Sequence, residues 1–132
     1  MTEIADYKNE GDVKKAVKKL LDAHNWFWWM PPGSAYGDHT VDFMAFRGGV
    51  FMVIETKFGK RLCTPLQKGF LTSITAETGF AFVVYEHRVT WFAAWLEAFD
   101  RARDCAAQDK PATNEDGAML IDAIREMTRE IV

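Results

Sequence analysis

Four stretches of the chain have apolar residues at the spacing of a helix that buries one face. The first covers residues 9–25, where lysines occupy the side opposite the apolar residues, and we interpret that side as solvated. The second covers residues 64–79, and Leu66, Phe70 and Ile74 form its expected buried stripe. The third begins at Thr90, and the last covers residues 118–131.

Shorter apolar runs between these helices are typical of strands. Residues 26–30 are followed by a Pro-Pro-Gly stop, residues 41–46 and 50–57 flank Gly48-Gly49, and residues 80–85 follow the second helix. The alternation within residues 26–30 favours aromatic side chains in the core. The alternative is that they stack on bases, as in proteins that bind single strands.

The order helix, strand, hairpin, helix, strand, helix, helix predicts an α/β fold in three layers, with a mixed sheet flanked by helices. We expect an αβββαβ core followed by C-terminal helices. The whole chain, residues 1–132, is expected to be one domain. Its core covers about residues 9–100, and a polar linker at 108–117 precedes the helix at 118–131.

Composition adds limits to this fold. A formal net charge of −3 does not indicate a nucleic-acid binder, although local charge and a bound metal ion decide the field at a site. Cys63 and Cys105 are far apart and suggest reduced thiols in the cytoplasm. No stretch approaches the roughly 18 apolar residues of a membrane span, so we expect no membrane partner.

The Gly48-Gly49 pair predicts a two-residue turn, because the favoured hairpin turns need positive φ. Counting outward pairs Arg47 with Val50 and places Asp42 opposite Glu55. Lys57, two residues further, shares the face of Glu55. Two opposed carboxylates repel unless a cation lies between them, and carboxylates suit a hard divalent ion. The alternatives are that Asp42 stabilises a turn or edge and that Lys57 only forms an ion pair with the acids.

This spacing resembles the active site of the PD-(D/E)xK nuclease superfamily, and the wider context is similar to its VRR-NUC branch and related phage proteins, which include Holliday-junction-resolvase-like enzymes. The resemblance covers roughly residues 10–92. The matching features are, in order, Tyr36-Gly37, Val41-Asp42, Gly49-x-Phe51-x-x-Ile54-Glu55-x-Lys57, Gly59-Lys60, Thr64-Pro65-x-Gln67 and Gly79-x-Ala81.

The resemblance implies a restriction-endonuclease-like fold and a DNA endonuclease or exonuclease that hydrolyses phosphodiester bonds, with a preference for branched DNA as one option. It also implies that Asp42, Glu55 and the carbonyl of Thr56 bind Mg²⁺ or Mn²⁺, and that Lys57 helps to activate water. The rival interpretation is a non-catalytic nucleic-acid-binding or regulatory module on the same fold.

Three further residues have two interpretations each. Gln67 suits a capping box with Thr64, and in the family a glutamine at this place orders the attacking water. Thr64, at a helix N-terminus, can also contact a phosphate. Glu10 suits the first turn of a helix, and in the family a glutamate here points at the metal.

Lys60, Arg61 and Lys68 lie near the expected site and suit phosphate binding, with ordinary solvated charge as the alternative. The large apolar residues of the third and last helices suggest a homodimer, unless those helices only cover the sheet of a monomer. We expect a cytoplasmic protein, in the host cytoplasm if a phage encodes it.

Overall fold

The computed structural model describes residues 6–32, 41–77 and 79–107. Its elements are, in order, α1 (Glu10–Ala23), β1 (Phe27–Trp29), β2 (Phe43–Arg47), β3 (Val50–Thr56), α2 (Pro65–Ala76), β4 (Phe80–Val84), the 3-10 helix η1 (Glu86–Arg88) and α3 (Val89–Ala107). This is the predicted order through the third long helix. The linker at 108–117, the helix at 118–131 and most of the loop before Val41 lie outside the described residues.

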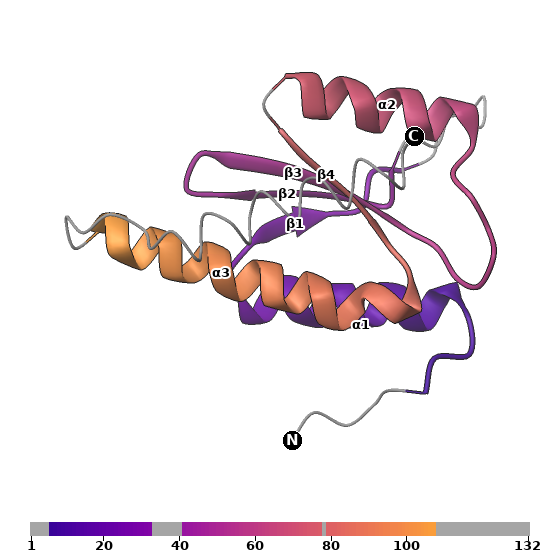
Figure 1. Cartoon of the computed structure of the whole chain (residues 1–132), viewed down its shortest axis with the longest axis horizontal. Helices are drawn as coiled ribbons and strands as arrows, with labels where there is room; N and C mark the ends of the chain where they lie inside the picture. Colours follow the sequence, from indigo (N-terminus) through magenta and orange to yellow (C-terminus); the bar gives the residue numbers. More distant parts are fainter. Residues whose placement is uncertain (1–5, 33–40, 78, 108–132) are drawn as a thin grey trace.

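The four strands form one mixed sheet in the order β1-β2-β3-β4. The pairs β1–β2 and β2–β3 are antiparallel, and β3 pairs with β4 in parallel after the crossover through α2. Figure 1 shows α1 and α3 together on one side of the sheet and α2 on the other. The predicted α/β class, with a mixed sheet flanked by helices, is therefore confirmed.

The hairpin between β2 and β3 has the predicted turn. Gly48 and Gly49 have φ angles of 55° and 84°, which other residues rarely adopt. The ladder begins with Arg47 opposite Val50 and ends with Phe43 opposite Ile54. The symmetric register about Gly48-Gly49 is thus confirmed, and it positions the two acids discussed below.

Each face of the sheet has its own core. On one face, α1 and α3 bury large side chains against the strands: Val13, Val17, Leu21, Phe92, Trp95, Leu96 and Phe99. On the other face, Leu71 of α2 packs with Val53, Ala81 and Val83. Because the aromatic residues of α3 lie in the first core, they support the monomer alternative for this helix, and the homodimer stays a prediction.

Two predicted core assignments are wrong in part. Trp26 is buried, but Phe27 is 70% exposed, because α2 packs on β4, at the opposite edge of the sheet from β1. Leu66, expected in the buried stripe of α2, is 55% exposed, since α2 buries Gln67 and Leu71 instead. None of the helices in the described residues combines the length and apolar character needed to cross a membrane.

Candidate metal and phosphodiester site

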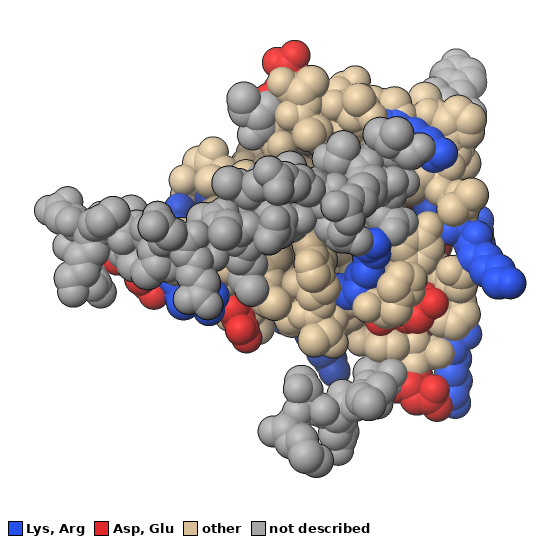
Figure 2. Space-filling model, viewed as in Figure 1, with Lys and Arg blue, Asp and Glu red and all other residues tan. Residues whose placement is uncertain are grey.

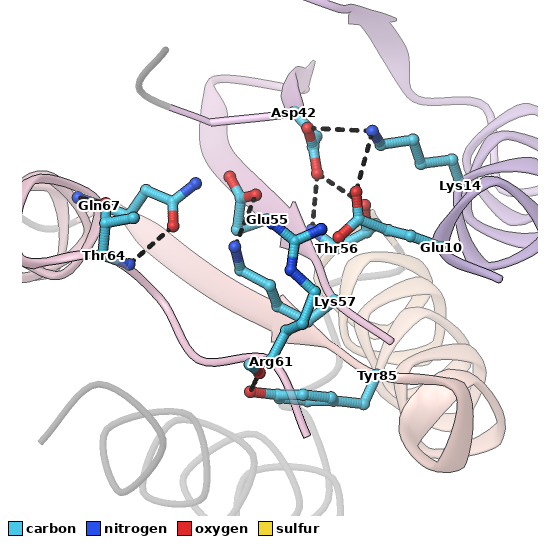
Figure 3. Close-up of polar contacts among 10 residues, drawn as sticks. All are labelled: Glu10, Lys14, Asp42, Glu55, Thr56, Lys57, Arg61, Thr64, Gln67 and Tyr85. Atoms are coloured by element: carbon cyan, nitrogen blue, oxygen red, sulfur yellow. Dashed lines mark hydrogen bonds and ion pairs between the residues drawn. The ribbon is translucent and has the colours of Figure 1, made fainter. Parts of the chain in front are cut away.

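Asp42 and Glu55 meet at the open end of the hairpin. The ladder ends at Phe43 and Ile54, so one further step brings Asp42 alongside Glu55. Asp42 accepts two hydrogen bonds at Oδ2, from the backbone N–H of Thr56 at 2.9 Å and from the Thr56 hydroxyl at 2.6 Å. Both carboxylates are buried, with exposures of 3% and 2%. The prediction that counting from the turn would bring the two acids together is confirmed (Figure 3).

Lys57 follows the last residue of β3 and lies on the same side as Glu55. Its Nζ is 3.8 Å from Oε1 of Glu55, and its side chain is almost fully buried. Its backbone N–H donates to the carbonyl of Val84 at 3.0 Å, which continues the contact with β4 beyond the ladder. The Lys57 ammonium is therefore held at the acids by the sheet itself.

Burial and, after it, the charge of Asp42 raise the pKa of Glu55 to about 8, although the charge of Lys57 opposes both. Among the described residues, Oε2 of Glu55 is buried and has no hydrogen-bond partner. A buried charge without a partner is unfavourable, so the carboxyl holds a proton at neutral pH when no further cation is present. The electrostatics of the site therefore favour the binding of a further cation.

Lys14 supplies a second ammonium group, which the sequence pattern had placed on a solvated helix face. That interpretation is wrong for Lys14, because its Nζ is 3.5 Å from Oδ1 of Asp42 and 3.2 Å from Oε2 of Glu10. Burial lowers the pKa of Lys14, but Asp42 and Glu10 outweigh burial and the net shift is upward. The i, i+4 spacing of Glu10 and Lys14 was the one available signal for this pair.

Glu10 is brought to the edge of the same site. It is the first residue of α1, where an acid is favoured by the helix dipole, and Figure 3 shows it beside Lys14 and Thr56. Both interpretations made for it are compatible with this position. Its one ion pair with a cation in the described residues is to Lys14.

The N-terminus of α2 has the predicted capping box. The Thr64 hydroxyl accepts from the N–H of Gln67 at 3.2 Å, and Oε1 of Gln67 accepts from the N–H of Thr64 at 2.9 Å. Gln67 is buried, and in Figure 3 its amide nitrogen is turned toward Glu55. The capping role uses the oxygen, so a second role for the nitrogen in the site stays a prediction.

The loop after Lys57 is anchored by residues that sequence reasoning did not single out. The Tyr85 hydroxyl donates to the carbonyl of Arg61 at 2.7 Å, and the Glu86 carboxylate accepts from the N–H of Gly59 at 3.0 Å. In Figure 3 the Arg61 side chain extends from this loop toward the carboxylates. Lys60 is exposed in the same loop.

Lys68 is half-buried in the first turns of α2. On the face shown in Figure 2, basic and acidic side chains are interspersed. The described residues on that face therefore form no broad basic surface, and the predicted phosphate contacts stay a prediction.

No three His, Cys, Asp or Glu side chains in residues 6–32, 41–77 and 79–107 form a group able to hold a metal ion by themselves. The donor set implied by the motif is smaller, with two carboxylates and one peptide carbonyl, and oxygen donors of this kind suit Mg²⁺ or Mn²⁺. The partnerless Oε2 of Glu55 is the observation in the structure that fits a cation.

Comparison of the chain with models of known protein families and with characterised proteins gives no match. The resemblance to the PD-(D/E)xK nucleases therefore depends on the motif residues, and membership of that family stays a prediction.

Proposed function

We propose that this protein hydrolyses phosphodiester bonds in DNA with the help of a divalent cation, Mg²⁺ or Mn²⁺. The observation that carries the proposal is Oε2 of Glu55, a buried oxygen without a hydrogen-bond partner among the described residues, beside the second carboxylate of Asp42 and the ammonium of Lys57. A cation at this place would relieve the repulsion between the acids and let both ionise.

Asp42, Glu55 and the carbonyl of Thr56 would hold the cation, with Glu10 at the edge of the site. When bound, such an ion lowers the pKa of a coordinated water and neutralises charge on phosphate oxygens. Asp42 is already oriented for this task by its two hydrogen bonds from Thr56.

The remaining residues act on the water and the phosphate. Lys57, close to Glu55, donates a hydrogen bond toward the attacking water and balances the charge that develops on the phosphate. Gln67 directs its amide nitrogen to the same water. Arg61, with Lys60, Lys68 and Thr64, contacts phosphates along the DNA backbone.

The chain has two cysteines, Cys63 and Cys105, far apart in the sequence, which suits a reducing compartment, so we place the activity in the cytoplasm. Both endonuclease and exonuclease action fit the proposed chemistry.

The test uses the purified full chain with labelled linear and branched DNA in Mg²⁺, Mn²⁺ or EDTA. Cleavage is expected with either metal and not with EDTA, and Glu55→Gln or Lys57→Ala should abolish it while the far-UV circular dichroism stays unchanged. Glu97→Gln and Lys15→Met, which alter exposed charges of the same kinds, serve as matched controls. Cleavage by Glu55→Gln at the wild-type rate would refute the assignment, and DNA binding without cleavage would favour the non-catalytic module.

A further inference from the structure

Lys14 lies between two carboxylates that belong to different parts of the chain. Glu10 is one turn earlier on α1, and Asp42 precedes β2. The Lys14 ammonium is 3.2 Å from Glu10 and 3.5 Å from Asp42, and dashed lines in Figure 3 mark both contacts. A positive charge therefore already occupies the space between the two acids on the α1 side of the site.

Asp42 has little acceptor capacity for more than one added ion. An ionised carboxylate offers about four lone-pair directions. Two at Oδ2 are used by the N–H and hydroxyl of Thr56, and one at Oδ1 is used by Lys14. At most one direction is left for a metal bond, which is too few for Asp42 to bridge two ions.

The two sides of Asp42 differ in what they lack. On the β3 side, Oε2 of Glu55 is buried without a hydrogen-bond partner in the described part of the chain. On the α1 side, the carboxylate of Glu10 already has the Lys14 ammonium as its counter-charge. The first side therefore keeps an unpartnered carboxylate oxygen even with the Lys57 ammonium at Oε1 of Glu55, whereas on the second side the Lys14 ammonium already balances Glu10.

We propose that the Lys14 ammonium takes the place of a second divalent cation, so that the site binds a single ion on the side of Glu55. This inference depends on the proposed function, because it specifies the metal content of the same site. It assigns Glu10 to the lysine and makes Lys14 a positioning residue that holds Asp42 and excludes another ion.

The experiment counts Mn²⁺ ions bound to the full chain without DNA, by calorimetry and by electron paramagnetic resonance. Wild-type protein should bind one ion per chain. Lys14→Met should bind two, with the spin–spin broadening of a close Mn²⁺ pair. Lys14→Arg keeps the charge and should bind one, and Lys15→Met, an exposed neighbour on the same helix, should match the wild type.

Two wild-type ions with spin–spin broadening would overturn the inference, and so would a single ion in Lys14→Met. Neither result would affect the proposed function, since cleavage with either number of ions still requires the metal. A wild-type protein that binds no Mn²⁺ at millimolar concentration would refute both proposals. Circular dichroism of Lys14→Met checks that its fold is retained, and Lys14→Arg supplies the comparison if it is not.

Discussion

Replacing Glu55 by glutamine is expected to make the metal-free protein more stable at neutral and alkaline pH. The substitution keeps the shape of the side chain and removes the group whose pKa is raised to about 8 by burial and by Asp42. The same change should abolish the proposed cleavage, so stability and activity would move in opposite directions.

The sign follows from proton binding. At a pH between 4.5, the ordinary pKa of this side chain, and about 8, Glu55 holds a proton in the native state and has lost it in the unfolded state. The native state then binds more protons, so stability falls as the pH rises through this window. At about 1.4 kcal/mol per pKa unit, the wild type loses roughly 3 kcal/mol from this group by about pH 7 and roughly 5 kcal/mol above about pH 8.

Urea denaturation in EDTA, at several values from about pH 5 to about pH 9, measures the effect. The quantity of interest is the unfolding free energy of Glu55→Gln minus that of the wild type. It should rise with pH by several kcal/mol, with the denaturant slope unchanged. Glu97→Gln, an exposed glutamate on α3, controls for the general loss of one acid.

A constant difference across this pH range would refute the reasoning. Glu55 would then ionise in the native protein as it does in the unfolded chain, and the site would not need a cation beyond Lys57 and Lys14. Glutamine also changes the contact with Lys57, which can add a constant amount to the difference in unfolding free energy at every pH. The prediction concerns the rise with pH on top of that constant.

Three other predictions concern the metal, the loop at residues 58–62 and the turn end of the hairpin. Mg²⁺ or Mn²⁺ should raise the melting temperature more at about pH 8 than at about pH 5, because the cation removes the cost of ionising Glu55; equal shifts would contradict this. Tyr85→Phe removes the hydrogen bond to the carbonyl of Arg61 and should speed amide hydrogen exchange in residues 58–62. It should also slow cleavage by about threefold to tenfold, and in an Arg61→Ala background it should cause no further loss of cleavage. Asp100→Asn should cost about 1 kcal/mol of stability, since the Asp100 side chain, 30% exposed, pairs with His24 and Arg47. Burial raises the pKa of Asp100, but His24 and Arg47 outweigh burial and the net shift is downward. The difference in stability between Asp100→Asn and the wild type should therefore be present above about pH 4 and disappear below it, in acid titrations followed by circular dichroism.

Local rules predicted the elements that position the site. Positive φ at Gly48 and Gly49 leaves one favoured turn, and the strand period then determines the register that brings Asp42 to Glu55. The capping box was predictable for the same reason, since Thr64 and Gln67 interact within one helical turn.

Contacts between segments far apart in the sequence were harder to predict. Lys14 has the periodicity of a solvated residue, and only the packing of α1 beside the hairpin gives it Asp42 as a partner. The anchoring of Arg61 by Tyr85 depends in the same way on where β4 ends. The exposure of Phe27 follows from the position of β1 at the edge opposite the strand that α2 covers, and no local pattern gives the order of the strands.

The topology of the sheet also has a consequence for the speed at which the chain folds. β2 and β3 are joined by two residues, whereas β3 reaches β4 only through the α2 crossover, so the hairpin can form first. In that order the two acids are brought together before β4 and the helices close around them. Protonation of Glu55 should therefore speed refolding, and stopped-flow refolding in EDTA should be faster at about pH 5 than at about pH 8, with a smaller difference for Glu55→Gln.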